Sequence, residues 1–504
     1  MEFSTKRALA VPAVVAALLT VTACSGSDSN ESTTAATNAT LRVNWGGFPE
    51  SWAPGAEGEA GYTRVPYENL VEVVKGEVKP VLAESWEQTD TALTLKLRQG
   101  VTFHDGTPFN AEAVKVNLET VRDAPGPYAG PLKVIKSIDA VDETTVKLNL
   151  AEPTPSMLTT LSTRATPMAS PKAIADKSIA QTPVGTGPWA YDAASSTAGT
   201  RMTFKFYDKY WGGADAVGFK TIALYAIPDD NQAVGALSSG EIDLSDVEPS
   251  AVDRLKGSPG METLMYPAIR NNPLFFDRGP GGVFEDVNVR RAACYALDTA
   301  TYVKVEPDMA VRTQHFAEGE PGHNPAVTGY QHDLTQAKSL AGGKQVSFEV
   351  LAAPFTQKQN EVYASQLSEL GWDVKVQVAP PPQWASTWNS GKYPFGLGAN
   401  DELTPFDWYK AWFAADAPGN PSKVESPALK AAADKAIAAG ATPEANALWA
   451  EVTKVIADEA LTCGHVVGQE TLAWNSAKVT GIAAPANAWE PNLVNYRDLK
   501  PAGA

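Results

Sequence analysis

The amino-acid sequence predicts a mixed α/β fold, and three observations support this class. The chain has 504 residues, which at about 150 residues per domain is enough for two to four domains with buried cores. Stretches of alternating apolar and polar residues, typical of half-buried strands, recur between stretches with helical periodicity. No period of about 20–50 residues recurs, which excludes solenoids and propellers.

The first 40 residues are predicted to lie outside the folded domains. Lys6 and Arg7 precede an apolar run over residues 8–23, which is the layout of a secretory signal peptide and is short for a membrane span. The run ends in Val-Thr-Ala-Cys, which resembles the bacterial lipobox, so we expect residues 1–23 to be removed and Cys24 to be lipidated. An ordinary signal peptide with a coincidental cysteine is the alternative. Residues 24–40 are rich in Ser, Thr and Asn, as a flexible tether would be.

Two strands and an intervening helix are predicted between residues 93 and 150. Residues 93–97 and 146–150 alternate apolar and polar side chains, so each segment should form a strand with one buried face. Asn110 is a suitable N-cap, and apolar residues follow at positions 114, 118 and 121 on one helical face.

In the second half, local signals predict two more helices and a strand. Thr356 and Gln359 have the spacing of a capping box, opening a helix that ends at Gly371. A strand with valines at 374, 376 and 378 follows. Thr442 and Pro443 are typical of a helix start. The apolar stripe of this last helix is predicted to comprise Leu448, Val452, Val455 and Ile456.

Composition and charge exclude several functional classes. Hydrophobic residues are 44% and charged residues 20% of the chain, so bulk disorder is not expected. With 41 Lys and Arg against 58 Asp and Glu, the net charge is −17, which would repel a nucleic acid. The sequence has no phosphate-binding loop and no HExxH motif, and its five histidines lack metal-ligand spacing. We therefore predict no catalytic residues, no metal site and no cofactor.

Besides the expected lipidation site Cys24, the exported chain has two cysteines, Cys294 and Cys463, in a compartment where disulfides persist. Sequence separation does not reveal their geometry, so a disulfide and two free thiols are both open. Cys463 and His465 could suggest a thiol catalyst, but no orienting group or nucleophile motif lies nearby in the sequence.

Tryptophans are concentrated in the last third of the chain, among Pro, Gly and Asn. Flat rings on irregular backbone are a common lining of small-molecule clefts, so Trp384, Trp388 and Trp408 are predicted cleft walls. Core packing is the alternative for each of them. Trp45 and Tyr62 are further candidates from the first part of the chain.

Several motifs, in order along the chain, closely resemble those of extracytoplasmic solute-binding protein family 5, the peptide and nickel class that serves ABC importers. The motifs are LAESW (82–86), LKLRQGVTFHDGTPFNA (95–111), PVGTGPW (183–189), YWGG (210–213), GEID (240–243) and VRRA (289–292). His104, within the second motif, is predicted to be a turn or packing residue because Asp-Gly and Pro follow it. The resemblance covers almost the whole exported chain.

This resemblance implies a type II periplasmic-binding-protein fold, in which two lobes are joined by a hinge and the first lobe carries an inserted domain. The implied ranges are 41–61, 183–274 and 484–504 for domain I, 62–182 for the domain II insertion, and 275–483 for domain III, the second lobe. The chain would cross between the lobes near 268–276 and 481–487. A ligand that contacts both lobes would favour the closed state.

The resemblance also suggests ligand contacts. Peptide-binding members pair the ligand ammonium with an acidic residue four positions before a proline, and Asp401 precedes Pro405 by that spacing. Asn400 adjoins it, whereas Gly398 replaces the tryptophan that such members commonly have, which puts a standard peptide pocket in doubt. Arg270, at the expected hinge, could bind a ligand carboxylate or form a hinge salt bridge.

The sequence therefore favours a monomeric, lipid-anchored binding protein on the outer face of the cell membrane, delivering a peptide or peptide-like solute to an ABC importer. Nickel or haem delivery is a variant of this function that the scarcity of histidine disfavours, although a chelated metal needs few protein ligands. The alternative is an envelope lipoprotein with the same fold that regulates or scaffolds a partner without transport. A hydrolase acting on wall glycan or peptide is the least favoured class.

Overall fold

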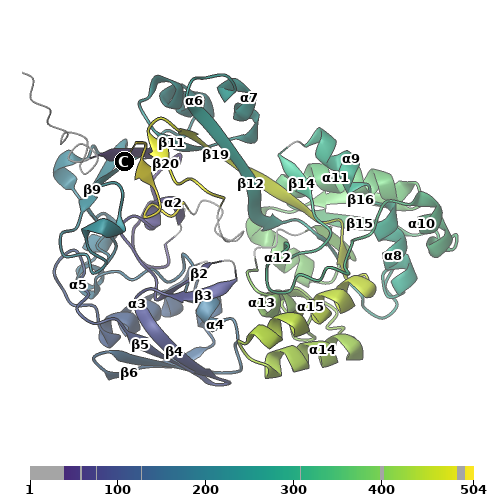
Figure 1. The fold of residues 1–504 in the computed structure, drawn as a ribbon. Helices are drawn as coiled ribbons and strands as arrows, with labels where there is room; N and C mark the ends of the chain where they lie inside the picture. Colours follow the sequence, from purple (N-terminus) through teal and green to yellow (C-terminus); the bar gives the residue numbers. More distant parts are fainter. Residues whose placement is uncertain are drawn as a thin grey trace, which may run out of the picture.

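The computed structural model describes residues 39–56, 60–74, 76–126, 128–306, 308–397, 402–484 and 494–503. The predicted signal peptide, the lipidation site Cys24 and most of the tether lie outside this part. The ribbon divides into two lobes, and the long paired strands β12 and β19 run from one towards the other (Figure 1). The predicted mixed α/β class is confirmed.

The first lobe is built on a sheet with the strand order β12-β19-β11-β1-β10-β9-β8, and β14 pairs with β19 at its side. In β1, Leu41 and Val43 are fully buried, which places the alternating apolar residues in the core. The strands are β1 (Thr40–Asn44), β8 (Trp189–Tyr191), β9 (Arg201–Phe206), β10 (Thr221–Tyr225), β11 (Leu244–Val247), β12 (Met261–Asn271), β14 (Met309–Val311) and β19 (Val466–Asn475). Its helices are α2 (Ala60–Thr63), α5 (Pro171–Ala175), α6 (Asp230–Ser239) and α7 (Val252–Leu255).

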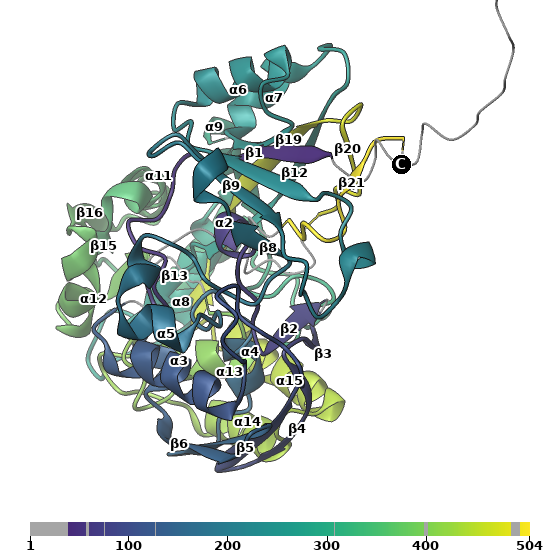
Figure 2. The same cartoon turned by 90° about the vertical axis from the view of Figure 1, so that its left-hand side faces the viewer.

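The predicted inserted region contains a separate antiparallel sheet, β4-β5-β7-β6, covered by α3 (Ala111–Asp123). The predicted strands correspond to β5 (Ala92–Leu97) and β7 (Thr145–Leu150), which pair with each other. Asn110 caps α3 by accepting a hydrogen bond from the Ala113 N–H at 3.0 Å, as predicted. The other elements are β2 (Val71–Val74), β3 (Glu77–Pro80), β4 (Ala83–Thr89), β6 (Ile135–Asp142) and α4 (Met157–Thr160). In Figure 1 and in Figure 2 this sheet lies opposite α6 and α7.

The second lobe is built on the sheet β16-β15-β17-β13-β18, surrounded by helices. Its strands are β13 (Leu274–Phe276), β15 (Ser347–Ala352), β16 (Asp373–Val378), β17 (Phe395–Leu397) and β18 (Thr462–Cys463). Its helices are α8 (Val287–Ala296), α9 (Thr299–Val305), α10 (Leu334–Ala341), α11 (Gln357–Ser368), α12 (Pro381–Asn389), α13 (Pro405–Trp412), α14 (Pro427–Ala438) and α15 (Pro443–Asp458). The short strands β20 (Val479–Thr480) and β21 (Lys500–Pro501) pair with each other.

The two helix starts predicted in the second half have different outcomes. Thr442 caps α15 as predicted, accepting a hydrogen bond from the Ala445 N–H at 3.2 Å. The capping box at Thr356 is wrong, because that hydroxyl closes the preceding short 3₁₀ turn by accepting the Ala353 N–H at 3.0 Å. The Gln359 amide instead donates to the Asn272 carbonyl at 3.2 Å, so a tertiary contact replaces the local one.

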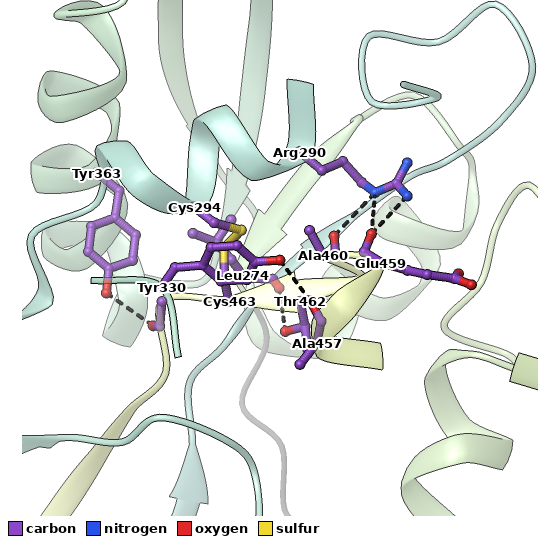
Figure 3. Close-up of a disulfide and its surroundings, with 11 residues drawn as sticks. Leu274, Arg290, Cys294, Tyr330, Tyr363, Ala457, Glu459, Ala460, Thr462 and Cys463 are labelled. Carbon is purple, nitrogen blue, oxygen red and sulfur yellow. Dashed lines mark hydrogen bonds between the residues drawn. A yellow bond between two sulfur atoms is a disulfide. The ribbon is translucent and has the colours of Figure 1, made fainter. Parts of the chain in front are cut away.

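A disulfide joins Cys294 of α8 to Cys463 of β18, which resolves the question that the sequence left open (Figure 3). Cys463 is therefore no free thiol, and its neighbour His465 accepts a hydrogen bond from Asn271 at 2.9 Å. Near the disulfide, Arg290 donates to the carbonyl oxygens of Glu459 and Ala460 (Figure 3). These contacts fasten α8 to the segment that leads into β18.

The chain passes between the two large sheets at Asn271–Leu274 and again between β18 and β19. β19 belongs to the first sheet, although its residues fall within the range 275–483 that the resemblance implies for the second lobe. The second passage thus precedes residues 481–487. The domain ranges themselves stay a prediction.

Candidate functional site

The order of the strands places a crevice on the first lobe. β1 lies between β10 and β11 and is parallel to both, because the chain crosses over β1 through α6 on its way from β10 to β11. In open α/β sheets, ligands bind outside the carboxyl ends of the strands at such a reversal. Here those ends are Asn44, Tyr225 and Val247.

The Asn44 side chain holds these strand ends together. Its amide nitrogen donates to the Ile227 carbonyl at 3.2 Å and to the Ser245 hydroxyl at 3.1 Å. Its oxygen accepts the N–H groups of Ile227, at 2.9 Å, and Gly46, at 3.2 Å. All four bonding positions of this buried amide are used, so the floor of the crevice is firmly defined.

A cavity of about 330 Å³ lies at these strand ends, and it is acidic. Its lining residues include the carboxylates Asp230, Asp246, Glu248 and Glu470, together with Trp45. Asp230 is paired with Arg254 and accepts the Glu248 N–H at 2.9 Å, while Glu470 accepts a hydrogen bond from the Tyr266 hydroxyl at 3.4 Å. Because Glu470 belongs to β19, the crevice includes one of the strands that run between the lobes. Several carboxylates around one cavity favour a positively charged group within it.

The second lobe repeats this topology. β15 is parallel to both of its neighbours, β16 and β17, and the chain reverses direction around it through α11 and α12. The carboxyl end of β15 leads into a 3₁₀ turn, Pro354–Thr356, in which Phe355 is 57% exposed. After β16, α12 brings Trp384 to the same edge of the sheet. Figure 1 shows α12 on the side of the second lobe that faces the first.

Trp384 belongs to an aromatic cluster that also contains Trp388, Trp412 and Phe275. The Trp384 ring stacks on Trp388 with centroids 6.0 Å apart, and Trp412 stacks on Phe275 at 4.0 Å. The Trp412 indole N–H donates to Glu402 Oε1 at 2.7 Å. The indole nitrogen of Trp384 is buried and has no hydrogen-bond partner in the part of the chain that the structure describes. An unsatisfied buried donor is costly, so a solute acceptor or a water at this position would be stabilising.

The other predicted aromatic residues are packed inside the lobes. Trp388 is 1% exposed and donates to the Gly419 carbonyl at 2.8 Å. Trp408 is buried and stacks on His315 with centroids 4.6 Å apart. Tyr62 is buried edge-to-face against Trp52, at 5.6 Å. Only Trp45 and Trp384 among the predicted aromatics therefore lie at the two crevices.

Three predicted contacts cannot be placed in this geometry. Asp401 and Asn400 lie outside the described residues, between the end of β17 and α13. Arg270 is part of β12, but its side chain lies outside the described part. In the part of the chain that the structure describes, no group of three or more His, Cys, Asp or Glu side chains is arranged to hold a metal ion. Nor does that part contain a helix with the length and hydrophobicity needed to span a membrane.

Sequence reasoning missed the four acidic residues of the first crevice and Phe355 of the second. Asp230 and Glu470 are 240 positions apart, so no local motif links them. The only available signal was indirect: polar residues directly after a predicted parallel strand are candidates for a crevice at the carboxyl edge.

Comparison with known proteins identifies the family. The family model for bacterial extracellular solute-binding proteins, family 5, matches residues 77–420. The glutathione-binding protein GsiB of Escherichia coli K12 is 32% identical over 242 residues, which are 45% of this chain and 45% of that protein. The probable D,D-dipeptide-binding protein DdpA of the same strain is 25% identical over 410 residues, covering 76% of this chain and 78% of DdpA. The match to GsiB thus spans about half of that protein's length.

A solved structure supports the same conclusion at the level of the fold. HbpA2 from Haemophilus parasuis superimposes with a TM-score of 0.81 at 20% identity, covering 92% of this chain and all of that chain. The predicted periplasmic-binding-protein fold is thereby confirmed. Since the family model matches well over half of the sequence, the chain belongs to family 5 of the bacterial extracellular solute-binding proteins.

Proposed function

We propose that this protein is the substrate-binding component of an ABC importer and captures a peptide or peptide-like solute that bears a free ammonium group. The acidic crevice at the ends of β1 and β11 carries this proposal. An ammonium group placed there would form charge-assisted hydrogen bonds with carboxylates, which are stronger than neutral ones. Two relatives bear names that refer to glutathione and to a D,D-dipeptide, and both solutes contain an ammonium group and amide bonds.

Capture would proceed by closure of the lobes over the solute. The first crevice would hold the ammonium group, while Phe355 and Trp384 would cover the solute from the second lobe. A solute that contacts both lobes binds the closed form better than the open form and shifts the equilibrium accordingly. Asp401, Asn400 and Arg270 remain proposed contacts, and Trp388, Trp408 and Tyr62 would support the walls from the core.

The test compares two ligands that differ only in their charge. We expect Ala-Ala to bind the purified chain measurably in a calorimetric titration, and N-acetyl-Ala-Ala to bind at least about tenfold more weakly. Glu470→Gln should reduce this difference, because it removes one carboxylate from the crevice. Glu262→Gln is the matched control, since Glu262 lies on the paired strand β12 and is exposed. Equal affinity for both dipeptides would contradict the ammonium assignment.

Native mass spectrometry of the purified chain would identify a co-purifying natural solute. If no dipeptide, tripeptide, sugar or metal chelate raises the melting temperature, and a non-transport protein co-purifies instead, the scaffold function would be supported.

We further propose that a lipid on Cys24 anchors the protein to the outer face of the cell membrane. In a bacterial host fed an alkyne-bearing fatty acid, the wild-type protein should be labelled and found in the membrane fraction. Cys24→Ala should remove the label and release the protein. A label that survives this substitution would contradict the anchor.

A further inference from the structure

The second lobe contains a cavity of about 300 Å³ that is separate from both crevices. It lies between the start of α9, the segments 311–315 and 327–332, α15, and residues 462–465. The disulfide sits against its inner end, and the exposed residues Thr313 and His332 lie among its lining residues. The cavity has no lining residue in common with the acidic crevice. Its size reaches the lower end of the range for small-molecule sites.

Arg312 brings an unsatisfied positive charge to this cavity. Its Nη1 donates to the His315 carbonyl at 3.0 Å, whereas its Nη2 is buried and has no hydrogen-bond partner among the described residues. Among the residues that the structure describes, no carboxylate forms an ion pair with Arg312. Burial lowers the pKa of Arg312, and the charge of Glu320 offsets only part of that effect, so an anion at Nη2 would be stabilising.

His465 supplies a second donor beside Arg312. The Asn271 amide group donates one hydrogen to His465 Nδ1 at 2.9 Å and the other to His315 Nδ1 at 3.2 Å. Because both Nδ1 atoms accept, each neutral ring carries its proton on Nε2. His315 Nε2 donates to the Glu402 carbonyl at 3.1 Å. No partner for His465 Nε2 is present among the described residues. Burial lowers the pKa of His465 to about 3, which keeps this ring neutral.

The backbone holds these two donors together. Val311 and Val466 are opposite each other in the β14–β19 pair, so Arg312 and His465 are the next opposing residues. The Arg312 N–H donates to the His465 carbonyl at 3.1 Å, which continues the ladder. Opposing residues project their side chains to the same side of an antiparallel pair.

About half of the remaining wall is apolar, and the wall includes one carboxylate. Leu297, Val327, Ile456 and Trp408 contribute buried apolar surface. The carboxylate belongs to Asp298, which caps α9 by accepting the Thr301 N–H at 2.8 Å and its hydroxyl at 2.6 Å. The Asp298 carboxylate is thus hydrogen-bonded to the first turn of α9.

We propose that this cavity is a second binding site, which takes a small organic carboxylate. Arg312 and His465 would hold the carboxylate group, and the apolar walls would hold a short hydrocarbon body. The site is independent of the solute bound between the lobes. It adjoins Asn271, the last residue of β12, where the chain passes between the lobes.

Anomalous diffraction can locate such a ligand directly. Crystals of the purified chain soaked in 3-bromopropionate should show a bromine peak in the cavity, with the carboxylate against Arg312. A peak only in the interlobe crevices, or no peak at all, would overturn the proposal. This measurement uses the unaltered protein, so it does not depend on the folding of a variant.

Calorimetric titration measures how much the negative charge of the ligand contributes to its affinity for the cavity. At constant ionic strength, butyrate should bind the wild-type chain, and butyramide should bind at least about tenfold more weakly. Arg312→Met should weaken butyrate by about the same factor. Arg122→Met is the matched control, because Arg122 is an arginine in the last turn of α3, outside both the cavity and the acidic crevice, and should leave butyrate affinity unchanged. Equal binding of the acid and the amide, or unaltered binding by Arg312→Met, would overturn the proposal.

Discussion

At the scale of single residues, Phe355 is the clearest test of the second crevice. Its ring is 57% exposed, and it follows the carboxyl end of β15, where the chain reverses direction. If the ring covers the bound solute, Phe355→Ala should weaken solute binding by about 1–2 kcal/mol, because that apolar contact is lost. The melting temperature of the solute-free protein should stay within about 1 °C, since the ring is outside the core. Calorimetric titration and thermal unfolding measure the two effects.

The control for this prediction is Val141→Ala. Val141 is also an exposed apolar residue, at 60%, but it belongs to β6 in the inserted sheet. It should change neither solute affinity nor stability. An unchanged affinity of Phe355→Ala would remove this ring from the site.

The tryptophans show how far residue-level reasoning from sequence extends. Trp384 and Trp388 are four positions apart on α12, so they share a helical face and carry the same sequence signal. The structure distinguishes them, because Trp384 is half-buried whereas Trp388 is 1% exposed; the backbone of Gly396 in β17 lies against both rings and closer to that of Trp388. A Cβ at Gly396 would come within 2.9 Å of that ring. The contact between the Trp388 ring on α12 and the backbone of Gly396 in β17 depends on how the helix packs on the sheet, so residue spacing alone does not predict it.

At the scale of elements, features that depend on neighbouring residues could be predicted and those that depend on tertiary contacts could not. Asn110 and Thr442 cap their helices because the bonded N–H groups lie three residues away. The predicted capping box at Thr356 does not form, because the Gln359 amide donates to the Asn272 carbonyl instead. The acidic crevice could not be predicted, since it requires the order of strands in the first sheet.

The segment that precedes β8 depends on glycine for a close approach. Gly185 packs on the backbone of Pro66, and a Cβ there would lie 2.0 Å from the Pro66 carbonyl oxygen. His104 fastens the same segment, accepting the Gly185 N–H at 3.3 Å and bonding through Nε2 to the Gly187 carbonyl at 2.9 Å. His104 is therefore a packing residue, as predicted.

Gly185→Ala should lower the free energy of unfolding by at least about 2 kcal/mol, because backbone atoms must move apart. Gly235→Ala in α6 is the matched control: no atom lies within 4 Å of its added Cβ. There, alanine should stabilise the helix by about 0.5–1 kcal/mol. Denaturant unfolding of both variants measures the contrast, and equal effects of the two substitutions would contradict the steric argument.

At the scale of the whole molecule, a hydrogen bond and an ion pair join described parts of the predicted inserted region to the second lobe. Ser156, at the start of α4, donates to Asp407 Oδ1 of α13 at 2.8 Å. Lys410, one turn later on α13, lies 3.8 Å from Glu152 and 3.4 Å from Asp416. Figure 1 and Figure 2 show α4 and α13 side by side. Separation of the lobes would break both contacts, so in the proposed closure they would favour the closed form.

Ser156→Ala should therefore shift the protein towards an open form. The loss of one hydrogen bond, about 1 kcal/mol, should weaken solute affinity about fivefold and increase the radius of gyration of the solute-free protein. Small-angle X-ray scattering and titration provide the two readouts. Ser137→Ala, on β6 of the same inserted domain, is the control and should change neither. An unchanged radius with unchanged affinity would show that the contact does not hold the lobes.

The same contact predicts a pH dependence of closure. Burial raises the pKa of Asp407, and the hydroxyls of Thr404 and Ser156 offset only part of that effect. Opening would expose the carboxyl group to water and return its pKa towards the ordinary value. The closed form thus holds the proton more tightly, and closure is favoured as the pH falls from above the raised pKa towards the ordinary value. Above the raised pKa, the full cost of burying the charge opposes closure.

Asp407→Asn isolates this effect, because the amide oxygen can still accept the Ser156 hydroxyl while the side chain no longer titrates. Solute affinity is measured for both proteins at a series of decreasing pH values. As the pH falls, the affinity of the wild type should increase relative to that of Asp407→Asn. All other ionisable groups are the same in the two proteins, so their contributions cancel in the ratio of affinities. A constant ratio across the acidic range would show that Asp407 does not couple protonation to closure.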